Sequence, residues 1–286
     1  MKKSWPVCFL LFSILLLVST KTIAEPKDSN GIDTVKIGTY LISLHDINFH
    51  DKEYTARFWV WMKYKNPNLD FSNKIEIPNA KETEIQSQMV SKSGEYIWTL
   101  MKLKCKMKQS WNVNDYPFDK QHLRIYIENT DFDIRSMIFV PDTSGKHFDP
   151  DLAIDGWDIT NLKISTSVSD YFTSFGDETI IDNKSAYSAM NIIIDIDRNA
   201  MGLFLKLFIG MYIAFFIAFI SFFIYHKEAD PRFGLPVGGL FAAVGNKYII
   251  DSILPESTNF SLVDMLHAIT FIYIFLILCV SVYSLR

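Results

Sequence analysis

The sequence predicts an extracellular or periplasmic antiparallel β-sandwich followed by an α-helical transmembrane bundle with three spans. Apolar and polar residues alternate in short segments of residues 25–199, whereas residues 200–286 contain long uncharged apolar stretches. A period of two is typical of strands with one buried face, and about 20 apolar residues are needed to cross a bilayer core of about 30 Å. The composition agrees with a membrane protein, because 49% of the residues are hydrophobic and the net charge is only −4. Without a basic cluster, this composition argues against a nucleic-acid partner.

Residues 1–24 are predicted to be a cleaved signal peptide. Lys2 and Lys3 form a positive start, residues 7–19 an apolar core, and residues 22–24 a cleavage site ending in a small residue. This apolar run is short for a membrane span. We therefore expect the mature chain to begin near Glu25, outside the cytoplasm.

Apolar and polar residues alternate along the exported segment, as they do in β-strands. The alternation covers residues 35–41, 58–64, 102–108, 123–127 and 191–196, and turn-forming residues separate these segments. Many short strands joined by turns favour a sandwich of antiparallel sheets.

The exported segment shows no sign of catalytic or metal chemistry. Cys105 is its one cysteine, so no internal disulfide can form there and the fold must depend on core packing. The chain contains no metal-ligand spacing, nucleophile motif or phosphate-binding loop, and we expect neither an enzyme nor a cofactor or metal. The aspartates at 142, 149, 151 and 155 would suit a divalent cation, or would form a solvated loop.

Three membrane spans are predicted, at about residues 203–225, 233–254 and 264–284. The middle one carries Lys247 and Asp251, and each charge in a lipid-facing helix centre costs about 2.5–3.5 kcal/mol. Either this segment does not cross, or it crosses while facing protein and water. Residues 226–232 carry basic side chains and residues 251–264 carry none, which places the first link in the cytoplasm and makes the middle segment cross. The predicted location is the cell (inner) membrane, multi-pass, with the N-terminal domain outside.

Several motifs occur together in this order. They are Trp59 five residues before Tyr64, the turn Tyr116-Pro117-Phe118-Asp119, Arg198 at the last strand, three close-spaced spans, and Leu254-Pro255 after the middle span. Over about residues 34–284 the chain resembles the pentameric ligand-gated ion channels (the Cys-loop receptor superfamily), and the cysteine-free bacterial branch above all. Where animal members place a disulfide around the turn, this chain has Gln109 and Leu123.

The resemblance implies a homopentamer in a lipid bilayer. An unknown small-molecule ligand or a proton acts on the outer sandwich and opens a pore for inorganic ions, lined by the second span. Counting back from Pro255, the pore face is expected to consist of Gly234, Gly238, Phe241, Gly245, Tyr248 and Ser252. Phe241 and Tyr248 would close the pore by dewetting. Alternatively, Gly234 and Gly238 form a helix contact and Phe241 is packing.

Two further groups of residues follow from the resemblance. Coupling between sandwich and helices is expected at Tyr116, Pro117, Phe118, Asp119, Arg198, Leu254 and Pro255. Asp119 would pair with Arg198, or only cap its own turn, and Phe118 would press on Leu254 and Pro255. Ligand binding between subunits is expected at Trp59 and Trp61 on one wall and at Thr130, Tyr171, Phe172, Phe175 and Tyr187 on the other, since aromatic faces attract cationic amines. The alternative is that each of these aromatic residues only packs in the core or on the surface and does not contact a ligand.

Some features depart from the family. The first span lacks the common proline and no fourth span follows, so the sequence is a fragment or this branch has lost that helix. The ion selectivity is indicated only weakly. Asp251 and Glu256 would attract cations to the outer mouth, whereas residues 231–234 resemble those of anion-selective members, and Lys247 would repel cations if it faced the lumen. Together these charges favour cations slightly. The alternative function is a non-conducting, membrane-anchored ligand sensor.

Overall fold

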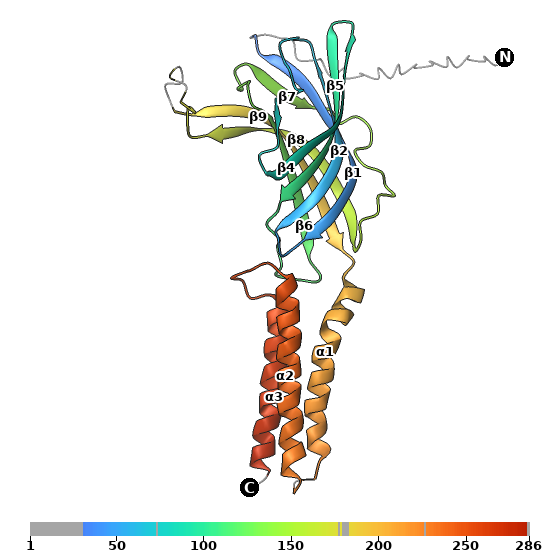
Figure 1. The fold of residues 1–286 in the computed structure, drawn as a ribbon, viewed down its shortest axis with the longest axis vertical. Helices are drawn as coiled ribbons and strands as arrows, with labels where there is room; N and C mark the ends of the chain where they lie inside the picture. The colour runs from blue at the N-terminus through green and yellow to red at the C-terminus, as the bar shows by residue number, and fades with distance from the viewer. Residues whose placement is uncertain (1–30, 73, 177, 179–182, 226, 285–286) are drawn as a thin grey trace, which may run out of the picture.

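The computed structural model describes residues 31–72, 74–176, 178, 183–225 and 227–284, so the predicted signal peptide lies outside the described residues. The described chain has nine strands followed by three long helices, with the strands gathered in one domain above the helices (Figure 1). The strands are β1 (Asp33–Asn48), β2 (Glu53–Tyr64), β3 (Ile75–Glu76), β4 (Ala80–Ser93), β5 (Tyr96–Lys108), β6 (Lys120–Asn129), β7 (Met137–Pro141), β8 (Trp157–Tyr171) and β9 (Ser185–Arg198).

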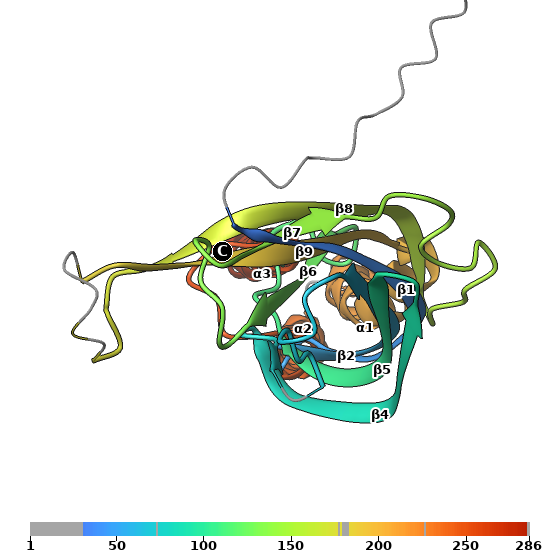
Figure 2. The same ribbon diagram turned by 90° about the horizontal axis from the view of Figure 1, so that it is seen from above.

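The strands form two sheets. One has the order β4-β5-β2-β1-β7 and the other β3-β6-β9-β8, and the view from above shows them wrapped around a common interior (Figure 2). The predicted sandwich is thus confirmed, with one local difference. β7 pairs with β1 in parallel, although antiparallel pairing was expected throughout. The reason is the connection: β7 follows β6 of the other sheet and therefore joins the edge beside β1 without a hairpin.

The core lies between the two sheets and follows the alternation seen in the sequence. Phe58, Val60 and Met62 of β2 are at most 1% exposed, and the β6 residues Leu123 and Ile125 face them from the other sheet with similar burial. Cys105 of β5 also lies in this core. Burial raises the pKa of its thiol to about 12, so this cysteine is an unreactive packing residue.

Three helices follow the sandwich and are long and apolar enough to cross a membrane. They are α1 (Ala200–Ile220), continued by the short 3-10 helix η1 (Ser221–Phe223), α2 (Ala229–Ile253) and α3 (Leu262–Tyr283). The three predicted spans are confirmed as helices. α2 begins four residues before the expected start at 233, because a proline such as Pro231 is tolerated in a first turn, where its missing N–H is not needed.

The helices pack through stripes of alternating four- and three-residue spacing. On α2 the buried residues are Arg232, Pro236, Gly239, Ala243 and Ile250. A Cβ atom at Gly239 would lie only 2.6 Å from the backbone oxygen of Ala214 on α1, so this glycine allows the two helices to approach closely. Small residues at helix contacts are typical of membrane bundles.

Candidate functional site

The turn at residues 116–119 places a carboxylate at the base of the sandwich. The side chain of Asp119 is 2% exposed. The Arg198 guanidinium, at the end of β9, donates from Nε to Asp119 Oδ1 over 2.7 Å and from Nη2 to Oδ2 over 3.2 Å. Gln121 Nε2 donates to the same Oδ2 over 2.6 Å. Asp119 thus joins β6 to β9 through a forked, charge-assisted pair.

Aromatic rings surround the guanidinium of this pair. The Cζ atom of Arg198 lies 4.0 Å from the ring centroid of Trp157, 4.7 Å from that of Phe49 and 4.9 Å from that of Tyr116. Phe49 in turn stacks on Trp111, with 4.5 Å between centroids. Sequence reasoning did not find this cage, because its rings come from three separate segments of the chain and share no spacing.

Two contacts connect this corner to the helices. The Phe118 ring lies 5.3 Å from that of Phe204 on α1, so this ring contacts the first helix. The expected contact of Phe118 with Leu254 and Pro255 stays a prediction. On the other side, the Leu262 N–H at the start of α3 donates to the Asn114 carbonyl over 2.8 Å. The loop before β6 therefore contacts both α1 and the start of α3.

A cavity of about 590 Å³ opens at the same junction. Its walls are the β1–β2 turn at residues 46–50, Tyr116 and Arg198 of the corner, and Ser252 and Ile253 at the end of α2. Ser252 was expected in the pore, and here it lies where the end of α2 meets the β1–β2 turn. Leu254 and Pro255, which follow α2, are buried.

α2 carries two opposite stripes. The packed stripe faces α1 and α3, and the other stripe is exposed along the whole helix; it consists of Gly234, Gly238, Phe241, Gly245, Tyr248 and Ser252. Phe241 and Tyr248 are 73% and 76% exposed. A Cβ at Gly234, Gly238 or Gly245 would meet nothing within 4 Å. Among the described glycines of α2, then, Gly239 lies at a helix contact, whereas a Cβ at the predicted pore-facing glycines would meet no neighbour.

Two of the charges in α2, Lys247 and Asp251, lie near the seam with α3. The Lys247 ammonium is 2.8 Å from Asp264 Oδ1 and also pairs with Asp251, one turn along α2. Next to it, Asn246 donates to the Leu207 carbonyl of α1 over 2.9 Å and contacts the fully buried His267 of α3 over 3.1 Å. These pairs satisfy polar groups at the end of the bundle next to the sandwich, as a helix inside a membrane would require.

The structure divides the predicted ligand residues into two groups. Trp59 and Trp61 lie on β2, in the five-stranded sheet, and the others lie in or next to the sheet that contains β8 and β9. Trp61 Nε1 donates to Asp142 over 3.0 Å, and its ring covers Gly38, where a Cβ would be 2.5 Å from the ring. Trp59 lies under the Lys102 ammonium, 5.6 Å from the ring centroid. Both tryptophans are therefore held in place within their own sheet.

One member of the second group, Tyr171, bonds to a buried carboxylate. Glu128 of β6 is 6% exposed and accepts hydrogen bonds from Ser169 Oγ over 2.5 Å and from the Tyr171 hydroxyl over 2.8 Å. The Tyr171 ring lies 5.7 Å from that of Tyr187 and 5.6 Å from that of Phe175. Burial, together with the Glu128 carboxylate, raises the pKa of Tyr171 to about 12, so its hydroxyl stays a donor at neutral pH.

Glu128 has no cationic partner among the described residues. A buried carboxylate bonded to Tyr171, whose ring contacts those of Phe175 and Tyr187, is suited to a cationic group. Sequence reasoning missed Glu128 because the alternation of β6 places it on the polar face of the strand.

Two predicted ligand residues lie apart from these rings. Phe172 is 86% exposed with the Lys184 ammonium 5.8 Å from its ring centroid, and Thr130 bonds to its neighbour Asp131 over 3.1 Å. Asp142, considered above as a cation ligand, already accepts hydrogen bonds from Trp61 and Ser144 and pairs with Lys36. Although partial burial acts to raise it, the pKa of Asp142 is lowered to about 2 by hydrogen bonds from Ser144, Trp61 and Lys36.

Comparison of the chain with models of known protein families and with curated proteins finds no match. The function must therefore be inferred from the geometry of the corner, of α2 and of the Glu128 site.

Proposed function

We propose that this chain is a subunit of a pentameric ligand-gated ion channel, in which a ligand on the sandwich opens a pore lined by α2. The observation that carries the proposal is the pair of opposite stripes on α2, one packed and one exposed. The exposed stripe combines glycines with Phe241 and Tyr248. One helix cannot enclose water, so several copies must place this stripe around a common axis.

The corner at the base of the sandwich supports coupling between ligand and pore. Asp119 and Arg198 hold β6 to β9, and the next residues of the chain after β9 form α1. Phe118 and Asn114 contact α1 and the start of α3. A displacement of β9 at the ligand site would therefore reach the helices through a rigid, buried connection.

The Glu128 site supports a cationic amine as the ligand class. Its carboxylate supplies the counter-charge and the rings of Tyr171, Tyr187 and Phe175 supply π faces. The β8–β9 hairpin projects sideways from the sandwich (Figures 1 and 2). In a ring of copies this hairpin would cover the face of a neighbour that carries Trp59 and Trp61.

The charges near the outer end of α2 support cations as the conducted ions. Asp251 and Asp264 share the one ammonium of Lys247, and Glu256 follows in the next loop. Each copy therefore adds negative charge to this end, and a ring of copies would concentrate cations there.

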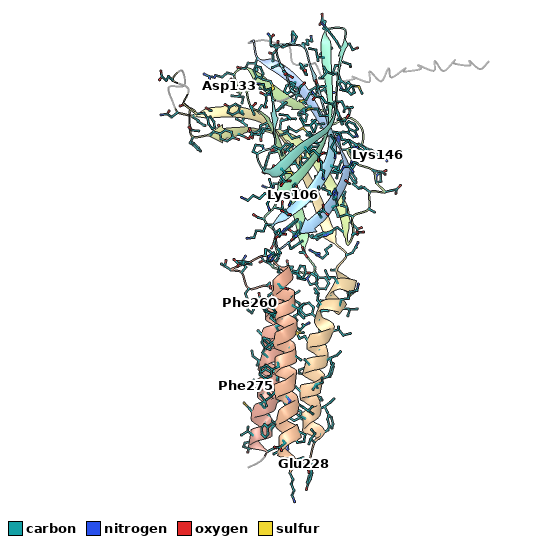
Figure 3. All side chains as sticks on the ribbon, in the orientation of Figure 1. Lys106, Asp133, Lys146, Glu228, Phe260 and Phe275 are labelled. Carbon is teal, nitrogen blue, oxygen red and sulfur yellow. The ribbon has the colours of Figure 1, made fainter. Side chains whose placement is uncertain are left out.

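The test is current across a bilayer that contains the full-length chain, with pH and small amines varied on the outer side. Phe241→Ala should change gating or conductance, because the ring lies on the exposed stripe of α2. Phe275→Ala is the matched control: this ring is 64% exposed on the outer side of α3 (Figure 3). Silence from an oligomer shown to be at the surface would instead support the non-conducting sensor.

Asp119→Ala tests the coupling separately. It should impair gating more than assembly, because Asp119 lies at the junction and away from the exposed stripe of α2. Gating like that of the parent chain would refute the role of the corner.

A further inference from the structure

Glu128 of β6 carries a negative charge that the described part of its own chain does not neutralise. It is 6% exposed, and its carboxylate accepts hydrogen bonds from Ser169 and Tyr171, which are both neutral donors. The described lysines next to β3 and β9, Lys74 and Lys184, pair with other carboxylates. A buried charge without a partner of opposite sign is costly. A cation from outside the chain is therefore expected at Glu128.

The outer face of the five-stranded sheet has the opposite excess. Arg57 of β2 and Lys104 of β5 are direct cross-strand partners, and Lys102 is the next residue on the same face of β5. None of the three forms an ion pair within the described residues. The Arg57 guanidinium donates from Nη2 to the neutral amide of Gln86 over 3.1 Å, and its buried Nε has no partner in the described chain. Even with Glu84 opposite Lys104, this face keeps an excess of positive charge, and like charges opposite each other are unfavourable.

Lys102 is the cation of this face that already lies against an aromatic ring. Its ammonium is 5.6 Å from the ring centroid of Trp59, its cross-strand partner on β2. A tryptophan face attracts a cation but does not neutralise it. The lysine stem is flexible, so the ammonium can stay near the ring and still reach a carboxylate. Lys102 thus places a positive charge on the wall that was expected to receive an amine.

Glu128 and Lys102 lie at similar heights above the helices. β2 follows the β1–β2 turn and β6 follows the turn at residues 116–119, and both turns lie at the base of the sandwich. Trp59, which is paired with Lys102, lies six residues after Glu53, and Glu128 lies eight residues after Lys120. At about 3.3 Å per residue these positions are about 20 Å and about 26 Å along their strands. A long lysine side chain can span the difference of about 7 Å.

The two charges also lie on different sides of the sandwich. Glu128 is bonded to Tyr171 at the end of β8, where the β8–β9 hairpin begins. In the view from above, this hairpin projects from one side of the sandwich, and β1 and β5 lie toward the other side (Figure 2). Different surfaces on two sides of one chain are what a head-to-tail ring requires. Complementary charges on such surfaces fix which parts of the neighbours meet.

We propose that Glu128 of one copy pairs with Lys102 of the neighbouring copy, and that a cationic amine binds by displacing this ammonium. The inference rests on the proposed ring of copies, and it names the group that neutralises Glu128 when no ligand is bound. The amine and the Lys102 ammonium carry the same charge and need the same carboxylate and aromatic faces, so they exclude each other. Arg57 and Lys104 strengthen the positive surface against which the hairpin side of the neighbour docks.

The pairing is tested by charge reversal in the full chain purified in detergent, with association measured by native mass spectrometry. Glu128→Lys or Lys102→Glu alone places like charges opposite each other, so each should weaken association about tenfold or more. The variant with both reversals should regain most of the association. Lys108→Glu is the matched control, because Lys108 is an exposed cation on the same face of β5, six residues farther along the strand. Combined with Glu128→Lys, it should restore nothing.

The displacement has a measurement of its own, calorimetry with butylamine on chains that mass spectrometry shows to be oligomers. Lys102→Gln should bind butylamine about fivefold or more tightly than the parent chain, because the competing ammonium is gone. Lys108→Gln should bind it as the parent does. An affinity of Lys102→Gln equal to or weaker than that of the parent chain would overturn the displacement.

Failure of the pairing can be told apart from failure of the ring. A double reversal no better than the single ones, or equal rescue by Lys108→Glu, would overturn the pairing while the parent chain still forms an oligomer. A parent chain that stays monomeric would refute the ring, and the pairing with it. If Glu128→Lys does not fold, Glu128→Gln and Lys102→Gln take its place. Their double variant should associate no more weakly than the weaker single variant, and additive losses would contradict the pairing.

Discussion

The buried pair of Asp119 and Arg198 allows the sharpest test of the fold. Their side chains are 2% and 11% exposed and make two hydrogen bonds to each other. Removing one partner of a buried pair costs about 3–5 kcal/mol, because the other charge stays buried. Asp119→Asn keeps the shape, so we expect a loss of about 3 kcal/mol. In a chain of this size that corresponds to about 6 to 12 °C in the unfolding temperature.

The assay is a double-mutant cycle on the full chain in detergent, followed by tryptophan fluorescence. Arg198→Gln should cost more than Asp119→Asn, because it also removes the contacts with three rings. The double variant should lose less than the sum of the two single losses. The control is Asp197→Asn, one residue before Arg198, whose partner Lys120 is 71% exposed; an exposed pair is worth about 0–1 kcal/mol. Additive losses, or an Asp119→Asn effect as small as that of the control, would refute the reasoning.

Three further predictions concern the helices, the sandwich and the ligand site. Gly239→Ala should lower the unfolding temperature of the full chain, because its Cβ would lie 2.6 Å from a backbone oxygen. Gly238→Ala, whose Cβ meets nothing within 4 Å, should raise the unfolding temperature slightly, since Ala stabilises a helix by about 0.5–1 kcal/mol relative to Gly. Equal effects of the two substitutions would contradict the packed stripe. The pKa of Asp142 is lowered from 3.8 to about 2, so its ionised form stabilises the fold above about pH 4 and this stabilisation is lost as the pH falls toward 2. Asp142→Asn should therefore flatten the fall in unfolding temperature between about pH 4 and about pH 2. An unchanged pH profile in this variant would argue against a stabilising role of the Asp142 carboxylate. Glu128→Gln should reduce amine binding, measured by calorimetry, about tenfold or more, whereas Asp131→Asn, on an exposed carboxylate nearby, should leave it unchanged; a similar loss in both variants would remove the special role of Glu128.

The Glu128 site shows why part of the chemistry could not be predicted from the sequence. The aromatic residues Tyr171, Phe175 and Tyr187 were candidates because of their type and position. Their relation to one carboxylate depends on β6 and β8 lying on either side of β9 in one sheet. No local pattern places Glu128 next to a residue more than forty positions away.

By itself the sequence determined the sandwich, the three helices and the α2 stripe, because these depend on local periodicity and on uncharged length. A period of two in β2 and β6 and long apolar stretches at residues 200–283 leave few other arrangements. The tertiary structure decided which groups meet. Both the ring contact of Phe118 with Phe204 and the pairing of Lys247 with Asp264 depend on elements brought together by packing. Contacts between distant segments are set by burial of the whole core and of the helix seams, and no short stretch of chain contains that information.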